Sequence, residues 1–141
     1  MGKQVITGTA KSQVVNRVII GNDMGGSLWA VAVHDCATGK DHYYGLRDRD
    51  GKRKEDRFYD LVREYLKQGF TVDVFYEAGR YGFSPARILM SLGAKVHILP
   101  INKLKVIMCG KVIKTDKLDA KFLSSLDPDS GLPEVYVPTV E

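Results

Sequence analysis

Two acidic residues, Asp116 and Asp119, stand three positions apart within a basic stretch of the chain. Residues i and i+3 of a helix project from the same face, so a helix through this stretch points both carboxylates one way. Neighbouring carboxylates repel each other unless a cation or a proton offsets their charge. The spacing therefore predicts half of a site for divalent cations, which further carboxylates must complete.

Charge is distributed unevenly along the 141 residues. Positions 80–125 hold nine basic and two acidic residues, the acids being Asp116 and Asp119, whereas positions 126–141 hold four acidic residues and no basic one. A basic surface around isolated acids is typical of a protein that holds a polyanion over a metal site. A solvated basic face without a partner accounts for the charge alone equally well.

The pattern of apolar residues and turn formers predicts one α/β domain with the order strand, strand, strand, helix, strand, helix, strand, helix. The first expected strand is a β-branched run that stops at Gly21, and the others lie at 28–33, 42–46, 71–76 and 95–100. The expected helices lie at about 58–66, at 84–92 and at the Asp116/Asp119 stretch. A basic linker or helix is expected at 101–114, before the last of these helices. A three-strand meander followed by alternating helices and strands is the ribonuclease H-like plan, a mixed sheet flanked by helices.

Two further acids stand where predicted strands end. Asp23 follows the first strand and Glu77 follows the fourth. Ligand sites of open α/β sheets lie at the carboxyl ends of their strands, so we expect these two carboxylates to join Asp116 and Asp119. Four carboxylates are suited to two hard cations such as Mg²⁺ or Mn²⁺, which act together in phosphodiester displacement. A lone acid at a strand end is more often a helix cap or turn former.

Two segments, YEAGRYG at 76–82 and KTDKLDA at 114–120, resemble the amino-terminal catalytic domain of DEDD transposases. These are the insertion sequence 110 family with its insertion sequence 1111 branch, to which the Piv invertase is related. The closing LPEVYVP at 132–138 is similar to the segment that follows in that family. The resemblance extends from about Val18 to the end of the chain.

This resemblance implies a RuvC-like fold whose metal-binding tetrad maps onto Asp23, Glu77, Asp116 and Asp119. It implies site-specific DNA recombination by a mobile element, guided by a structured RNA, in a homo-oligomer of the full-length protein. A second domain downstream carries a serine in this family, so the present chain is expected to be inactive alone. The implied division is a lead-in at 1–13, the catalytic domain at 14–126 and an acidic linker at 127–141.

The first acid departs from the family pattern. Asn22 stands where an aliphatic residue is usual, and no Lys follows Asp23 within the next few positions. An Asn on a core strand requires hydrogen-bond partners. Asp35, the other acid at a strand end in this region, follows the second strand, so Asp23 remains the predicted ligand.

Basic and aromatic residues around these acids are predicted to contact the phosphates and bases of DNA or RNA. The candidates are Arg80, Tyr81, Arg87, Lys103, Lys105, Lys111, Lys114 and Lys117. Each of them taken alone is more often a solvated or packed side chain. Taken together, and next to Asp116 and Asp119, these residues favour nucleic-acid binding.

Three other functions agree with parts of the pattern. A stand-alone RuvC-type Holliday junction resolvase matches the length, and a non-catalytic nucleic-acid-binding module matches the charge. An actin-like ATPase is suggested by residues 23–27, but no second phosphate-binding loop supports it. No stretch approaches the roughly 18–20 apolar residues that cross a bilayer, so we expect no membrane partner. Two cysteines without metal-ligand spacing are typical of a cytoplasmic protein, and the transposase resemblance implies that it is nucleoid-associated in a prokaryotic cell.

Overall fold

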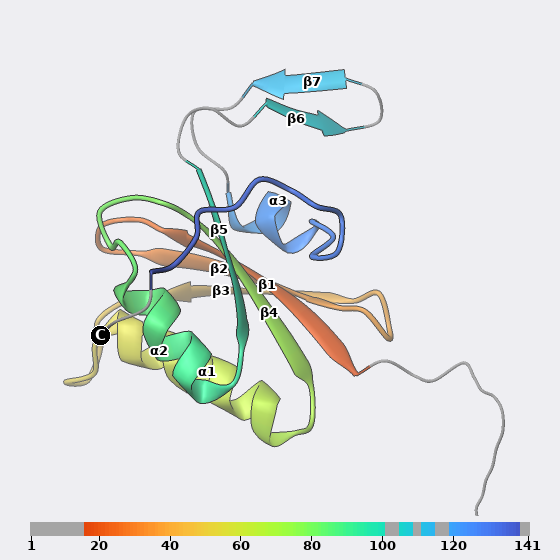
Figure 1. Ribbon diagram of the computed structural model, residues 1–141. Helices are drawn as coiled ribbons and strands as arrows, with labels where there is room; N and C mark the ends of the chain where they lie inside the picture. Colours follow the sequence, from red (N-terminus) through yellow and green to blue (C-terminus); the bar gives the residue numbers. More distant parts are fainter. Residues whose placement is uncertain (1–15, 101–104, 109–110, 115–118, 139–141) are drawn as a thin grey trace, which may run out of the picture.

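A computed structural model describes residues 16–100, 105–108, 111–114 and 119–138 of the chain (Figure 1). Five strands form one sheet in the order β3-β2-β1-β4-β5. They are β1 (Arg17–Met24), β2 (Trp29–Asp35), β3 (Asp41–Leu46), β4 (Thr71–Glu77) and β5 (Lys95–Leu99). The first three strands are antiparallel to one another, whereas β4 lies parallel to β1 and β5 parallel to β4.

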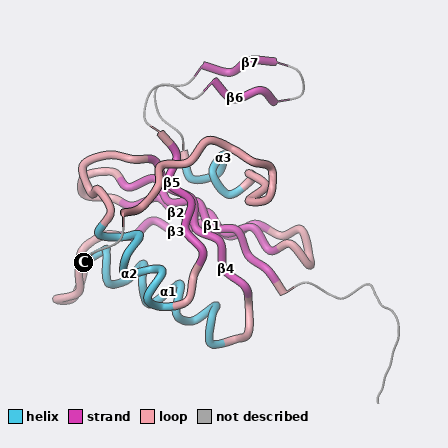
Figure 2. Tube along the Cα trace, viewed as in Figure 1, coloured by secondary structure: helices cyan, strands magenta, loops and turns pink. Residues whose placement is uncertain are grey.

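Helices cover both faces of this sheet (Figure 2). The helices α1 (Lys54–Lys67) and α2 (Ser84–Leu92) lie on one face, and the short helix α3 (Ala120–Ser124) lies on the other (Figure 1). A meander that supplies the central strand, followed by helices that cross to parallel strands, is the ribonuclease H-like arrangement. The predicted fold class is therefore confirmed, and its central strand is β1.

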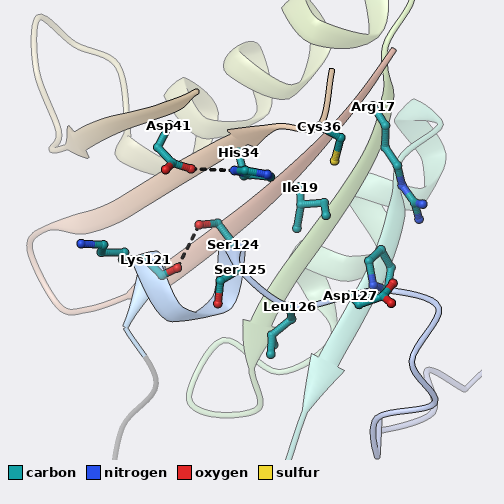
Figure 3. Close-up of a pocket in the computed structure, with 11 residues that line it drawn as sticks. Arg17, Ile19, His34, Cys36, Asp41, Lys121, Ser124, Ser125, Leu126 and Asp127 are labelled. Carbon is teal, nitrogen blue, oxygen red and sulfur yellow. Dashed lines mark hydrogen bonds and ion pairs between the residues drawn. The ribbon is translucent and has the colours of Figure 1, made fainter. Parts of the chain in front are cut away.

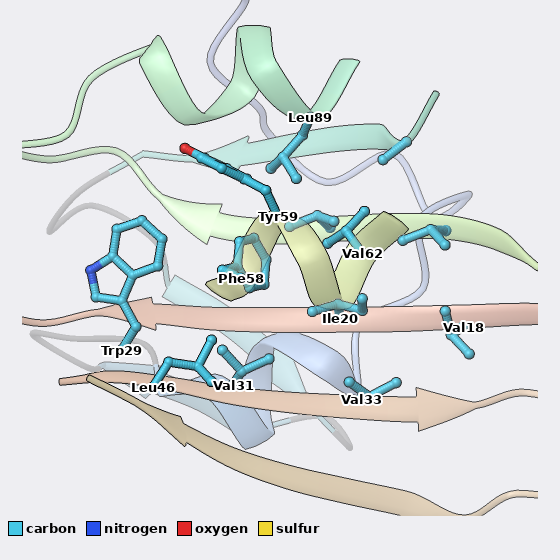
Figure 4. Packing of buried hydrophobic residues seen from close by; sticks show 13 residues of the cluster. Val18, Ile20, Trp29, Val31, Val33, Leu46, Phe58, Tyr59, Val62 and Leu89 are labelled. Carbon is cyan, nitrogen blue, oxygen red and sulfur yellow. The ribbon is translucent and has the colours of Figure 1, made fainter. Parts of the chain in front are cut away.

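The larger core lies between the sheet and the helices α1 and α2 (Figure 4). Val18 and Ile20 of β1 face Phe58 and Val62 of α1, and Trp29 closes one end, edge-on to Phe58 with 5.9 Å between the two ring centres. Even-numbered residues of β1 therefore face this core, because successive side chains of a strand point to opposite faces. Odd-numbered residues of β1 face α3.

Two local expectations were wrong. The first strand continues past Gly21 to Met24, because the backbone beyond Gly21 pairs with β2 on one side and β4 on the other. In place of a basic linker or helix at 101–114, two strands form an antiparallel hairpin, β6 (Lys105–Met108) and β7 (Lys111–Lys114). Each strand carries a β-branched pair, which favours extended backbone.

Residues 127–138, here called the C-terminal strap, lie against the domain. Val135 donates a backbone hydrogen bond of 2.7 Å to the Ile98 carbonyl, and Val137 packs beside Tyr76 and Ala86. The segment predicted as an acidic linker thus packs against β5 and, at position 138, against α2. The predicted lead-in at 1–13 lies outside the described residues. In the described part of the chain, no helix has the length and apolar character needed to cross a membrane.

Candidate metal centre at the carboxyl ends of the strands

Asp23 and Glu77 occupy neighbouring positions at the carboxyl ends of two parallel strands. The last paired residues of β1 and β4 are Asn22 and Tyr76, so the two acids stand on the next rung. Parallel strands are separated by about 4.8 Å. Because side chains alternate along a strand, both carboxylates project from the face that α3 covers. The structure therefore brings together the two acids predicted at strand ends, each of them half-buried.

Asp119 is the residue immediately before α3, and its carboxylate caps that helix. Oδ1 of Asp119 accepts a 2.8 Å hydrogen bond from the backbone nitrogen of Phe122. The cap satisfies one of the amide groups that a helix N-terminus leaves unpaired. Asp119 was expected within a helix together with Asp116, but the described helix starts only at Ala120. Asp is a good cap because its short side chain reaches nearby backbone amides, and this preference sets the start of α3.

Gly21 determines how closely α3 approaches β1. The carbonyl oxygen of Ala120 would lie 2.3 Å from a Cβ at position 21, so a larger residue there requires the helix to move. Gly21 lies two residues before Asp23 on the same face of β1. The glycine thus places the N-terminus of α3, and with it Asp119, near the strand end that carries Asp23.

The predicted tetrad is not complete within the described residues. Asp116 lies outside them, and no three His, Cys, Asp or Glu side chains in the described ranges are close enough to hold one ion. The donors that the structure does place are carboxylates, which suit Mg²⁺ or Mn²⁺ rather than a thiophilic metal. In donor chemistry and strand position, Asp23 and Glu77 fit such an ion, with Asp119 on the adjoining helix.

Tyr81 connects the loops that follow the two acid-bearing strands. Its hydroxyl donates a 3.1 Å hydrogen bond to the Gly25 carbonyl, and its ring stands edge-on to Trp29 with centres 5.1 Å apart. The guanidinium carbon of Arg80 lies over the Tyr81 ring, 6.0 Å from the ring centre. The Tyr76 hydroxyl donates a 2.9 Å hydrogen bond to the Gly82 carbonyl, which also fixes the loop after β4. Burial raises the pKa of Tyr76 to about 12, so this phenol remains a donor.

The predicted nucleic-acid contacts divide into two groups. Arg80 and Arg87 are exposed, and Arg87 donates a 3.3 Å hydrogen bond to the Pro138 carbonyl. The lysine side chains lie outside the described residues, at Lys103, Lys105, Lys111, Lys114 and Lys117. The backbone positions of Lys105 and Lys114 are paired across the β6–β7 hairpin.

A cluster that sequence reasoning missed lies further back on the same face. Asp73 of β4 is fully buried, and its two carboxylate oxygens lie 2.8 Å from Arg17 and 2.8 Å from His97. The signal was present as a single acid inside the apolar run at 71–76. Burial raises the pKa of Asp73, but hydrogen bonds from His97 and Arg17 outweigh it and hold that pKa below its ordinary value.

A cavity of about 450 Å³ lies at the opposite end of α3 from the acids (Figure 3). Ile19 forms its floor, with His34 and Asp41 on one side and Lys121 and Ser124 on the other. None of the predicted site residues lines this cavity. The site proposed from the sequence and this cavity are therefore distinct features of one face.

Comparison with known proteins gives structural similarities alone. No protein-family model matches the chain, and no curated protein matches it. The structure of Thermus thermophilus RuvC is 18% identical over 66% of this chain and 68% of that chain, with a TM-score of 0.43. YeaZ from Pseudomonas aeruginosa is 15% identical over 64% of this chain and 45% of that chain, with a TM-score of 0.36. The ribonuclease H-like fold follows from the order and direction of the strands.

Proposed function

We propose that this chain is the amino-terminal, divalent-metal-dependent catalytic domain of a DNA transposase or site-specific recombinase. The observation that carries the proposal is the position of Asp23 and Glu77 on adjacent parallel strands, on one face and one rung. Two carboxylates side by side attract positive charge, and in this proposal a divalent cation is held between them.

Asp116 and Asp119 complete this proposed site. The helix cap uses one oxygen of Asp119, Oδ1, so its second oxygen is suited to a ligand role. When bound, two Mg²⁺ or Mn²⁺ ions stabilise the charge that develops on the attacking and leaving oxygens of a phosphodiester. Asp23 and Glu77 would hold the ions from the sheet, and Asp119 would hold them from the start of α3, the helix that packs on Gly21.

The transposase assignment rests on the two acid-bearing segments at 76–82 and 114–120 and on the basic charge around them. DNA is the proposed substrate, and a structured RNA from the mobile element is the proposed guide. Exposed Arg80 and Arg87 and the lysines of 103–117 supply phosphate contacts, which position a nucleic acid without reading its sequence. A downstream domain and a homo-oligomer belong to the same proposal.

Titration with Mn²⁺ tests the metal site directly. Mn²⁺ binding is measured by calorimetry or by electron paramagnetic resonance for the wild-type chain, Asp23→Asn, Glu77→Gln and Asp116→Asn. Glu64→Gln is the matched control, since Glu64 is an exposed acid on α1, on the opposite face. We expect each site variant to weaken binding by about tenfold or more, equivalent to about 1.4 kcal/mol. Site variants that bind Mn²⁺ as the control does contradict the proposal.

Strand cleavage distinguishes the recombinase from the other classes. The 141-residue chain, alone and joined to the downstream domain that the proposal includes, is incubated with linear element DNA or a four-way junction, with and without element RNA. A recombinase requires the RNA and Mg²⁺ and loses activity in Asp23→Asn. Cutting of the four-way junction by the 141-residue chain alone identifies a junction resolvase. Binding without cation-dependent cleavage in any combination identifies a non-catalytic module.

A further inference from the structure

His97 of β5 lies between two carboxylates that come from different parts of the chain. Its Nε2 is 2.8 Å from Oδ1 of Asp73 on β4, and its Nδ1 is 2.9 Å from Oε2 of Glu134 in the C-terminal strap. A neutral imidazole carries one N–H and can donate to a single carboxylate. Two carboxylate partners therefore require the imidazolium, which donates from both ring nitrogens.

The guanidinium of Arg17 makes a second connection between Asp73 of β4 and the C-terminal strap. Arg17 of β1 donates from Nε to Asp73 Oδ2 at 2.8 Å and from Nη1 to Asp129 Oδ2 at 3.2 Å. Asp73 thus holds two cations, and each cation reaches one acid of the strap. Charge-assisted hydrogen bonds of this kind are stronger than neutral ones.

We propose that His97 is a proton-controlled latch that fastens the C-terminal strap across the edge of the sheet. Protonated His97 joins β4 to Glu134, and the adjoining residue Val135 then pairs with the backbone of Ile98 on β5. Loss of the proton leaves His97 with one N–H for two carboxylates. This inference concerns the strap and stands independently of the metal chemistry.

The link that breaks on deprotonation is the one to Glu134. The Asp73 side chain is 1% exposed and cannot be hydrated without opening the sheet, whereas the Glu134 side chain is 35% exposed and water can replace the imidazole there. An unpaired buried carboxylate costs far more than a hydrated one. The single remaining N–H therefore stays with Asp73, and the strap loses its link through Glu134, which makes its opening easier.

The groups facing His97 come from every element packed around it. The Phe75 ring stacks on the imidazole with centres 4.5 Å apart, and Asp73 stands beside Phe75 on β4. Arg17 and Asp129 act through Asp73, and Cys36 adjoins Arg17 at the far end of the cluster. Burial alone lowers the pKa of His97, but hydrogen bonds to Asp73 and Glu134 outweigh burial and raise that pKa above its ordinary value.

The sign of the linkage follows from this raised pKa. The stabilising contribution of His97 is fully present below the pKa of the unfolded chain, about 6.5, and is lost as the pH rises through the higher folded value. The strap is therefore expected to be closed at mildly acidic pH, below the pKa of the unfolded chain, and to open as the pH rises through the raised pKa of His97. Between the pKa of His97 in the open state and its higher pKa in the closed state, the equilibrium constant for opening the strap rises about tenfold for every pH unit.

Nuclear magnetic resonance of the 141-residue chain tests the latch. The titration of His97 is followed through its ring carbon signal, and hydrogen exchange of the Val135 amide is measured over the same pH range, corrected for intrinsic exchange. We expect Val135 protection to fall with the deprotonation of His97 while protection of the Ile20 amide in the core stays constant. In Glu134→Gln, Val135 protection is lower at mildly acidic pH and no longer changes with the titration of His97.

Asp41→Asn is the control, because Asp41 pairs with His34 in the same manner, with 2.8 Å between Oδ1 and Nδ1, on strands β3 and β2 at the edge of the sheet opposite β5. This variant should leave Val135 protection and its pH dependence as in the wild type. Protection of Val135 that stays constant while His97 titrates overturns the proposal. So does a Glu134→Gln chain whose Val135 amide behaves as in the wild type.

Discussion

Gly21 of β1 and Leu123 of α3 approach so closely that a Cβ at position 21 would stand 2.6 Å from the Leu123 Cβ. The same atom would lie 2.6 Å from the Ser124 nitrogen, which is part of the helix backbone. Backbone cannot rotate away as a flexible side chain does, so the contact sets the height of α3 above the sheet. The position of the Asp119 carboxylate depends on that height.

Replacing Gly21 with alanine is expected to displace α3 and destabilise the domain by about 1–3 kcal/mol, the usual cost of overpacking. Urea unfolding measures the change, and Mn²⁺ affinity should fall in parallel because Asp119 moves with its helix. Gly26→Ala is the control, since a Cβ at position 26 meets no atom within 4 Å. Equal stability of the two variants contradicts this account of α3.

Asn22→Val is expected to stabilise the domain. Asn22 is fully buried on the core face of β1, and neither Oδ1 nor Nδ2 has a hydrogen-bond partner among the described residues. A buried polar group without partners costs about 1–3 kcal/mol, and valine removes that cost while favouring extended backbone. Thermal unfolding should therefore shift upward, with Mn²⁺ affinity unchanged because position 22 faces away from the acids. A loss of stability would show that the amide has a partner.

Two substitutions at Asp119 separate its capping role from its proposed metal role. Asp119→Ala removes the cap and is expected to cost about 1 kcal/mol of stability. Asp119→Ser keeps a capping oxygen, so stability should remain near wild type while Mn²⁺ binding weakens as in the alanine variant. If Asp119→Ser keeps both the stability and the Mn²⁺ binding of the wild type, Asp119 acts only as a helix cap.

Asp73→Ala should be among the most destabilising single changes, at about 3 kcal/mol, because it leaves Arg17 and His97 without their buried carboxylate. Its lowered pKa means that this contribution is present above the ordinary Asp value of about 3.9 and is lost as the pH falls through the folded value. Urea unfolding at pH 7 and pH 3 measures both effects. Asp60→Ala, which breaks exposed pairs with Lys52 and Arg63, should cost under about 1 kcal/mol.

Strand order was predictable because the chain alternates between apolar runs and turn formers, and connection rules leave few topologies for such an order. The same pattern placed Asp23 and Glu77 at the carboxyl ends of strands, which register then brought to one rung. The hairpin at 105–114 was also visible in principle, since two β-branched pairs flank Cys109 and Gly110. Its high lysine content suggested a linker and obscured this signal.

Other features depend on partners that are distant in the sequence. Nothing local distinguishes Gly21 as a packing site from a glycine that ends a strand, because the contact comes from residues about 100 positions later. Asp73 resembles any acid on a half-exposed strand until Arg17, His97 and the strap surround it. Asp119 was predicted inside a helix because the sequence does not show at which residue the helix starts, and the start at Ala120 leaves Asp119 one position outside it.

The C-terminal strap also has a mechanical consequence. It runs from the end of α3 past the β5 edge to α2, where its last described residue, Pro138, accepts a hydrogen bond from Arg87. A pull on the chain at Pro138 first meets Arg87, then Val135 and Glu134, and then the ion pair of Asp129 with Arg17, before any force reaches α3. The contacts therefore break one after another, and α3 with its cap Asp119 keeps its place against β1 until the last of them has failed.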